Sequence, residues 1–315
     1  GDGMYKAYKF RLYPNDVQKN LINKTFGSSR FIYNYYLNKM KDNGYTSVYN
    51  NISDYTNKLK YDATFLQEVD STVIKNSLFN LERAYKKTFN TTGEYPKFKN
   101  KYTKNSYNTT AVYSKYNGNE YSTIELDLKN KIVKLPRLNW LKIRGYRNLK
   151  KINGKIISAN ISKEPTGKYY VSILYKVTDV ISNKLPRTIV GIDLGIKKLL
   201  TLSTGKIYEN NKYIAKYEKR IKRKQKELSR KIKGSENYKK CKIELAKLCS
   251  KLSNARKYYT HKITKEITDE YGIITCESLN TKSMIINGKK NNLSSKINDA
   301  TFAEIIRQLS YKSKY

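Results

Sequence analysis

Residues 189–195, Ile-Val-Gly-Ile-Asp-Leu-Gly, place one carboxylate in the middle of an apolar run. Because valine and isoleucine dominate this run, we predict a strand that is buried on both faces of a sheet. A charge at Asp193 is costly in such a strand unless a partner compensates it. We expect that partner to be a metal ion or a set of backbone N–H donors.

Three further short strands are predicted downstream, over residues 199–202, 205–208 and 273–277. The last of them, Ile-Ile-Thr-Cys-Glu, ends in a second carboxylate, Glu277. If these strands lie side by side, Asp193 and Glu277 meet at one edge of the sheet. Two carboxylates brought together in this way suit magnesium, because this hard cation prefers oxygen ligands.

The composition is strongly basic. The 315 residues include 64 Lys and Arg against 26 Asp and Glu, which is a formal net charge of +38. Such a charge repels itself unless a polyanion neutralises it, and nucleic acid is the expected polyanion. A general charge-driven or ribosome-associated binder is the alternative. No apolar run has the length of a spanning helix, so we expect no membrane partner and a cytoplasmic protein of two or three domains.

The cysteines and the histidine indicate no further chemistry. Cys241, Cys249 and Cys276 form no C-x-x-C pair, so neither a zinc site nor a disulfide framework is predicted. The single histidine, His261, is expected on a helix surface rather than in catalysis. The 30 tyrosines are able to stack on bases, although the genome of an AT-rich organism would produce the same composition.

The first part of the chain is predicted to combine a strand with helices. Residues 5–13 alternate basic and apolar side chains, which predicts a strand with one basic face. A helix should start after Pro14, and the small residues 27–29 should divide it into two helices, as in a helix-turn-helix. Residues 43–61 are predicted to be a polar loop, and residues 71–89 form the best amphipathic helix.

Short strands and long basic helices are predicted for the rest. The strands cover residues 123–128, 131–135, 141–144, 155–162 and 169–177. Two basic helices, 212–233 and 236–271, favour contact with a nucleic-acid duplex, although they could also be a solvated support for the core. A last helix is predicted over residues 299–311, with Asp299 as its N-cap and Phe302, Ile305, Ile306 and Leu309 facing inward.

The order of these elements, with carboxylates on two strands of the second half, resembles an RNase H-like fold. More narrowly, the chain resembles TnpB, a family of transposon-encoded RNA-guided nucleases related to type V CRISPR effectors. The stretches that carry the resemblance are residues 6–14, 81–89, 95–99, 135–143, 191–195, 228–231 and 277–280, which follow in the family's order. The resemblance extends from Met4 to Tyr315.

The resemblance implies an α/β multi-domain protein. A β-barrel wedge domain would comprise residues 4–14 and 120–186, and a helical recognition domain would be inserted as residues 15–119. A RuvC-like domain, residues 187–315, would include the basic helical hairpin 212–271 and would lack its final strand and zinc ribbon.

The resemblance also implies partners and site residues. A structured guide RNA and double-stranded target DNA with an adjacent motif would be bound, and Lys75, Asn76 and Asn80 would read that motif. Asp193 and Glu277 would be catalytic residues that hold magnesium. The residues expected to contact the nucleic-acid backbone are Lys9, Arg11, Arg83, Lys97, Lys99, Arg137, Lys142, Arg144, Arg220 and Arg223. For each of these, a solvated surface side chain is the alternative.

The sequence departs from the family's pattern after Glu277. Only 315 − 277 = 38 residues follow, without the family's zinc-binding C-x-x-C motifs and without a third catalytic aspartate. Asp299 and Glu304 are the only later acidic residues, and both fall where the family has an ordinary helix. We therefore expect the catalytic set to be incomplete.

Three functions are compatible with these features. The first is an RNA-guided DNA-binding protein that does not cut and represses transcription, as TnpB-like nuclease-dead repressors do; magnesium would then be vestigial. The second is an active RNA-guided endonuclease of which this is a truncated chain. The third is a nonspecific basic RNA-binding protein. We favour the first, as a monomer with one RNA in the bacterial cytoplasm that joins the nucleoid when bound to DNA.

Overall fold

The computed structural model describes residues 4–90, 94–102, 104–146, 148–177, 188–195, 198–210, 212–276 and 293–313. The chain divides into two compact units, Gly1–Asp179 and Val180–Tyr315, each with a hydrophobic core of its own. Within the described ranges, every helix is too short or too polar to span a bilayer.

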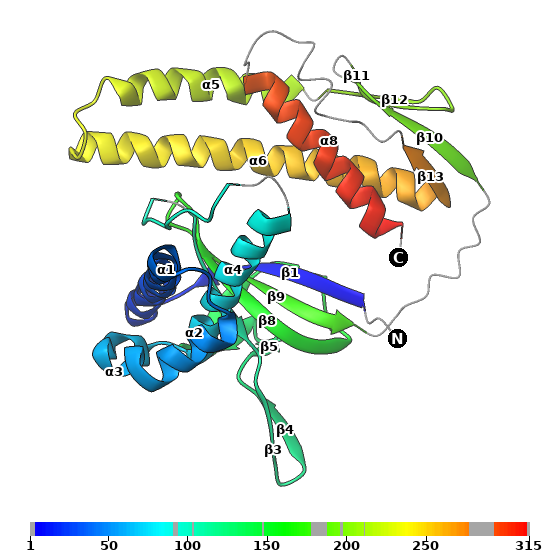
Figure 1. The fold of residues 1–315 in the computed structure, drawn as a ribbon. Helices are drawn as coiled ribbons and strands as arrows, with labels where there is room; N and C mark the ends of the chain where they lie inside the picture. Colours follow the sequence, from blue (N-terminus) through cyan, green and yellow to red (C-terminus); the bar gives the residue numbers. More distant parts are fainter. Residues whose placement is uncertain are drawn as a thin grey trace. The chain divides into compact units, whose positions relative to one another are not determined.

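The first unit is built on an antiparallel sheet of seven strands (Figure 1). Their hydrogen-bonded order is β2 (Asn105–Thr110), β8 (Gly154–Lys163), β9 (Tyr169–Val177), β1 (Met4–Tyr13), β7 (Asn139–Arg144), β6 (Ile132–Leu135) and β5 (Glu125–Asp127). The strands predicted for this half are therefore present. No described pairing joins the edge strands β2 and β5, so the part of the expected barrel that the structure describes is an open sheet.

Three strands were not predicted from the sequence. β2 reads Asn-Ser-Tyr-Asn-Thr-Thr, and the hairpin of β3 (Tyr113–Tyr116) and β4 (Asn119–Ser122) is equally polar. β2 lies within the segment 15–119 that was predicted to be helical, yet it pairs along its whole length with β8. Pairing with a neighbour, rather than apolar alternation, makes this segment a strand.

The core of this unit lies between one face of the sheet and two helices. Phe10 and Leu12 of β1 are almost completely buried there. The helix α1 (Asp16–Asn43) contributes Ile22 and Phe26, and α4 (Ser71–Asn90) contributes Val73. The predicted wedge and helical segments thus share one core, and each fully buried large apolar side chain contributes roughly 1.5–3 kcal/mol to its stability.

The helix α1 is continuous over 28 residues, so the predicted break at residues 27–29 is wrong. Asn15 starts the helix in a capping box: its side chain accepts from the Gln18 N–H, and the Gln18 side chain accepts from the Asn15 N–H. The small residues serve packing instead, because Ser28 is buried and the Ser29 hydroxyl oxygen lies 2.7 Å from that of Ser77 on α4. Small side chains let two helices approach closely here rather than turn the chain.

The polar stretch 43–61 is mostly helical rather than the predicted loop. It contains α2 (Val48–Asp54), a π-helical turn (Tyr55–Leu59) and the start of α3 (Lys60–Asp62), followed by a 3-10 turn (Thr64–Glu68). Val48, Tyr55 and Leu59 are buried in a second cluster with α1 and α4. Their spacing was the helical signal, but the many intervening Asn and Ser residues obscured it.

The second unit has a sheet of four strands, ordered β12 (Ile207–Glu209), β11 (Lys198–Leu202), β10 (Ile189–Leu194) and β13 (Ile273–Cys276). β10 runs antiparallel to β11 and parallel to β13, so the strands predicted to lie side by side do so. The helices α6 (Glu236–Glu270) and α8 (Leu293–Lys312) share a core with one face of this sheet.

This one-sided packing corrects the prediction that residues 189–195 are buried on both faces. Val190, Ile192 and Leu194 enter the core, whereas Asp193 is exposed on the opposite face. In the part of the chain that the structure describes, helices pack on only one side of β10, so the strand alternates like an ordinary half-covered strand.

Two basic helices, α5 (Lys212–Ser229) and α6, form the predicted hairpin (Figure 1), and Ser235 caps α6. The last helix differs from its prediction. α8 begins at Leu293, so Asp299 lies inside the helix and is not its N-cap. Ile306 is 38% exposed instead of facing inward, whereas Phe302, Ile305 and Leu309 are buried.

Candidate nucleic-acid interface and carboxylate edge

The outer face of β1 carries cations and an aromatic ring. Successive side chains of a strand point to opposite faces of the sheet. Phe10 and Leu12 therefore enter the core, and Lys9, Arg11 and Tyr13 lie on the other face. The alternation that was predicted for residues 5–13 is confirmed from Lys9 to Tyr13, where it separates a hydrophobic from a basic surface; Tyr5, Lys6 and Ala7 are all exposed.

Arg11 and Arg144 lie directly opposite one another in the β1–β7 pair. The guanidinium carbon of Arg11 lies 5.0 Å from the centroid of the Tyr13 ring, and that of Arg144 lies 5.6 Å from the same centroid. Arg11 is also 5.6 Å from the centroid of the Tyr170 ring on β9. Both arginines thus share Tyr13 as an aromatic platform.

This arrangement concentrates positive charge without an acidic partner. In the described ranges, no carboxylate lies within ion-pair distance of Arg11 or Arg144. Like charges directly opposite in a sheet are destabilising. Each exposed cation–π contact offsets this by a stabilisation of only about 0.5–1 kcal/mol. An external anion is the partner that this pair of arginines fits, and a phosphodiester matches the geometry of guanidinium.

Two lysines extend the same surface. The Lys9 ammonium nitrogen lies 4.4 Å from the Tyr170 ring centroid and 3.7 Å from the Glu164 carboxylate. Lys142 is exposed and lies opposite Tyr13. We term this surface the outer basic face; it consists of Lys9, Arg11, Tyr13, Lys142, Arg144 and Tyr170. Its cations were predicted from the sequence, but its two tyrosines were not, because the strand pairing that brings them to the arginines is invisible in the sequence.

The three predicted readers of the DNA motif differ in their surroundings. Lys75 and Asn80 are exposed on α4. The Asn76 amide nitrogen instead donates to the Asn108 carbonyl at 2.9 Å and to the Thr110 hydroxyl at 3.1 Å, both on β2. Asn76 therefore joins α4 to the sheet, and its amide is already engaged.

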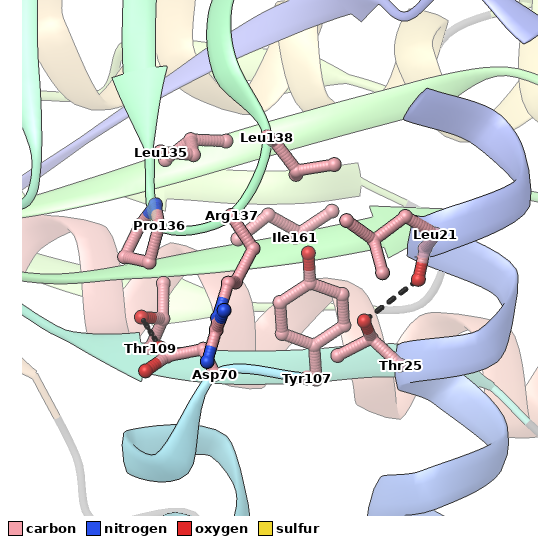
Figure 2. Close-up of a pocket in the computed structure, with 10 residues that line it drawn as sticks. All are labelled: Leu21, Thr25, Asp70, Tyr107, Thr109, Leu135, Pro136, Arg137, Leu138 and Ile161. Carbon is pink, nitrogen blue, oxygen red and sulfur yellow. Dashed lines mark hydrogen bonds between the residues drawn. The ribbon is translucent and has the colours of Figure 1, made fainter. Parts of the chain in front are cut away.

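Two other predicted backbone contacts lie apart from the outer basic face. Arg83 is exposed on α4, where it donates to the Asn80 side chain at 3.5 Å. Arg137 occupies the turn between β6 and β7 with a φ of +64° and lines a small pocket. Figure 2 shows the Arg137 side chain extending toward Asp70 and Thr109, where the Thr109 hydroxyl donates to the Asp70 carboxylate.

The two lysines of residues 95–99, both expected to contact the nucleic-acid backbone, differ in their surroundings. Lys97 is exposed and pairs with Glu94. Lys99 is partly buried, with its ammonium nitrogen 3.9 Å from the centroid of the Tyr33 ring. Burial lowers the pKa of Lys99, and its cation–π contact with Tyr33 engages the ammonium group within the fold.

On the helical hairpin, the predicted contacts Arg220 and Arg223 are exposed on α5. Other cations of this hairpin are used within it: Lys224 lies 2.7 Å from Glu227 and 2.8 Å from Glu244, and these hydrogen bonds raise the pKa of Lys224. Lys224 thus stabilises the packing of α5 against α6. For this residue, a role in supporting the core is favoured over contact with nucleic acid.

The carboxylate edge of the second unit consists of Asp193 and its neighbours on the open face of the sheet. Asp193 pairs with Thr201 of β11. The Ser203 hydroxyl accepts from the Gly191 N–H at 3.0 Å. The parallel register joins Ile192 to Cys276, the residue before Glu277; Glu277 itself lies outside the described residues.

The chemistry of this edge fits a hard cation, because the donors beside Asp193 are carboxylate and hydroxyl oxygens. The described residues contain no group of three His, Cys, Asp or Glu side chains that could hold a metal ion. Asp193 is exposed, so its charge is solvated and needs no compensating partner, contrary to the expectation for a buried strand.

Comparisons with known proteins match both units. Residues 172–287 match the OrfB_IS605 family model, described as probable transposase, and residues 4–46 match a model described as a helix-turn-helix domain. In the structure, the latter residues form β1 and the single helix α1.

Full-length relatives and one solved structure are also similar. The chain is 29% identical over 326 residues to the putative RNA-guided DNA endonuclease InsQ of Escherichia coli (strain K12), covering 98% of this chain and 77% of that protein. It is 28% identical over 316 residues to a putative RNA-guided DNA endonuclease of Streptomyces pristinaespiralis, covering 98% and 74%. The cryo-EM structure of a Cas12f1–sgRNA–target DNA complex contains a chain with a similar fold, at a TM-score of 0.57 and 11% identity, covering 100% of this chain and 88% of that one.

The matched stretches of sequence, the relatives along nearly the whole chain and the shared mixed α/β fold lead to one conclusion: the chain belongs to the TnpB family of transposon-encoded proteins.

Proposed function

We propose that this protein binds DNA under the guidance of an RNA. The observation that carries the proposal is the outer basic face, where Arg11 and Arg144 oppose one another with no carboxylate partner among the described residues. A phosphate backbone supplies the missing negative charge. The names of both relatives, RNA-guided DNA endonucleases, support the same class of partner.

In this proposal, recognition is divided between RNA and protein. Base pairing by the guide selects the target sequence, and the protein holds the backbones and reads a short adjacent motif. Lys75 and Asn80 are exposed on α4 and are able to reach base edges, whereas the amide of Asn76 is held by β2. We infer one protein molecule for each structured guide RNA.

We further propose that the polypeptide of this sequence binds its target without cutting it and thereby represses transcription. Support comes from the small set of residues that match catalytic carboxylates, Asp193 and Glu277, since hydrolysis with two metal ions needs a larger set of ligands. Magnesium, if bound by these oxygens, would supply Lewis-acid stabilisation of the phosphate. Asp193, with Thr201 opposite it in the β10–β11 pair, would be a ligand of such an ion at the open face of the sheet.

An RNA-guided DNA endonuclease is the second candidate. The parallel pairing of β10 with β13 favours it, because this pairing brings the strand that leads into Glu277 beside the strand of Asp193. The relatives carry the endonuclease name as well.

Sequencing the RNA that copurifies with the protein tests the shared part of both candidates. A discrete structured RNA that directs binding to a matching DNA site supports RNA guidance. Binding that is indifferent to RNA sequence supports the nonspecific RNA binder instead, and the absence of both RNA and site selection overturns the proposal.

Incubation of the loaded complex with target DNA and magnesium separates the two candidates. The matched controls are Asp193→Asn and Glu277→Gln, which remove charge with little change of shape. Site-specific binding with intact DNA supports the non-cutting protein. If the wild type cuts the target specifically and neither variant does, the protein is an endonuclease. This result would contradict repression by binding alone.

A further inference from the structure

We propose that the segment Glu94–Lys99 is a stacking site for an unpaired nucleotide. The site is distinct from the outer basic face, and its binding of a nucleotide requires neither a guide nor cleavage. The proposal rests on three observations: hydrogen bonds anchor the segment to α1 and α4, it exposes two aromatic rings beside a pocket, and two lysines line that pocket.

Hydrogen bonds hold this segment although it belongs to no helix or strand. The Asn34 amide on α1 donates to the Lys99 carbonyl and its carbonyl oxygen accepts from the Lys99 N–H, both at 2.8 Å. At the other end, the Thr88 hydroxyl on α4 lies 3.2 Å from both the Ala84 and the Glu94 carbonyl oxygens and shares its one proton between them. Pro96 is buried between these two anchors.

The partly buried ammonium group of Lys99 reinforces this attachment. Its ammonium nitrogen lies 3.9 Å from the centroid of the Tyr33 ring, a contact that fixes the segment against α1. A segment that is held in place before a ligand arrives loses less conformational entropy on binding. Rigid attachment of a polar, exposed loop is therefore a property expected of a binding surface.

The anchored segment leaves its aromatic rings in solvent. Tyr95 is 66% exposed and Phe98 is 46% exposed. Together with Lys41, Glu94, Pro96 and Lys97, they line an open pocket of about 480 Å³.

The charges around the pocket favour a phosphate group attached to an aromatic ligand. The Lys41 ammonium nitrogen lies 4.4 Å from the Phe98 ring centroid, and Lys97 is paired with Glu94, the one carboxylate of the lining. One cation, that of Lys41, is thus left in excess at the rim. An aromatic base that stacks on Tyr95 or Phe98, with its phosphate near Lys41, would satisfy both the exposed rings and this charge.

The ligand must be unpaired, because paired bases in a duplex hide their faces in the stack. An unpaired nucleotide could belong to a single-stranded RNA or to a displaced DNA strand, and the chemistry of the site is the same for both. Short single-stranded oligonucleotides of each kind, carrying one fluorescent 2-aminopurine, distinguish the two sources because stacking on a ring quenches that base.

The experiment uses the full chain with Tyr95→Ala, Phe98→Ala and Tyr95→Phe, and Tyr102→Ala as the matched control. Tyr102 is 80% exposed on the same stretch but does not line the pocket. We expect quenching with at least one oligonucleotide, affinities about 10-fold weaker in the two alanine variants of the pocket, and unchanged binding in Tyr95→Phe and Tyr102→Ala. The sugar of the better-bound oligonucleotide identifies the source.

Equal quenching in the wild type and in both pocket variants would overturn the site, as would equal quenching with a 2-aminopurine duplex. The melting temperature of each variant is compared with that of the wild type, so that a loss of binding is distinguished from a loss of fold. Failure here is distinguishable from failure of the proposed function, because guide-RNA binding through the outer basic face is measured separately with Arg11→Ala.

Discussion

At the scale of single residues, Arg11 and Arg144 show how the fold makes a site from side chains that are distant in sequence. Each arginine alone reads as an ordinary surface cation. The β1–β7 register sets them opposite one another over Tyr13. Two facing cations cost free energy in the unbound sheet, and the phosphate backbone that we propose as their partner would offset this cost.

Replacing either arginine by alanine should therefore weaken RNA binding and reduce its dependence on salt. Each lost phosphate contact should lower the slope of log K against log salt by about 0.7–0.9. Lysine at either position keeps the charge and should keep the slope, although affinity falls because the bidentate geometry is lost. Titrations at several salt concentrations measure this, and an unchanged slope in both alanine variants would exclude phosphate contact at the outer basic face.

Asn76 is a single residue whose predicted role in DNA binding is replaced by a structural one. The sequence predicted a reader of bases, but its amide is bonded to Asn108 and Thr110 of β2. Asn76→Ala should lower the free energy of unfolding by about 1 kcal/mol, because it removes hydrogen bonds to two partly buried partners. Lys75→Ala and Asn80→Ala should leave stability unchanged and alter the preference for the adjacent DNA motif. Denaturant titration and DNA-binding assays on the three variants separate the two roles, and an Asn76→Ala protein of full stability would contradict this assignment.

At the scale of elements, the small residues in the middle of α1 lie within a continuous helix and do not form a turn. Gly27 lies inside the continuous helix, and a Cβ atom at this position would meet nothing within 4 Å. Gly154 differs, because its φ is +155° and a Cβ would lie 2.5 Å from the Lys176 carbonyl oxygen.

Gly27→Ala should consequently raise the stability of the first unit by about 0.4–1 kcal/mol, through better helix propensity and a less flexible unfolded chain. Gly154→Ala should destabilise the same unit and is the matched control. Thermal or denaturant unfolding measures both. A destabilised Gly27→Ala protein would indicate that a turn exists at this position after all.

A carboxylate of α8, Glu304, supports one contact of this helix with α6, so the stability of α8 should be sensitive to pH. Glu304 accepts two hydrogen bonds from Arg307, each at 2.8 Å, and one from Gln308, whose own carbonyl oxygen accepts from Thr264 of α6. The Arg307 bonds, only partly opposed by burial, lower the pKa of Glu304 from 4.5 to about 2.

Because the folded-state pKa is depressed, the stabilisation by Glu304 is complete above its ordinary pKa of 4.5 and is lost as the pH falls toward about 2. Glu304→Gln should therefore melt at a lower temperature than the wild type at neutral pH, and the difference should shrink as the solution is acidified. A difference in melting temperature that is constant with pH would show that the charge of Glu304 does not stabilise α8.

At the scale of the whole molecule, the net charge of +38 governs behaviour in solution. The unbound protein should gain thermal stability as salt is raised from low concentration, because screening reduces self-repulsion. RNA binding should weaken over the same range, because counterion release becomes less favourable. Opposite trends in melting temperature and in affinity are the expected result; an affinity that is independent of salt would contradict binding through the backbone.

Much of the fold was predictable from local pattern. Alternation identified β1, apolar runs identified β10, β11 and β13, and helical spacing identified α4, α5 and α6. The polar strand β2 and the helices of residues 48–62 were missed, because neighbours that are remote in sequence stabilise them. The candidate site followed the same division: its cations were predicted, and its tyrosine platforms were not.

The sequence by itself determined which class of partner we propose, since a charge of +38 and the positions of Asp193 and Glu277 are properties of the chain before it folds. Only the tertiary structure decided that Arg11 meets Arg144, that Asn76 is occupied by β2, and that Asp193 lies on an open face. The physical reason is that charge is additive along a chain, whereas contact between side chains depends on strand register and on which face a helix covers.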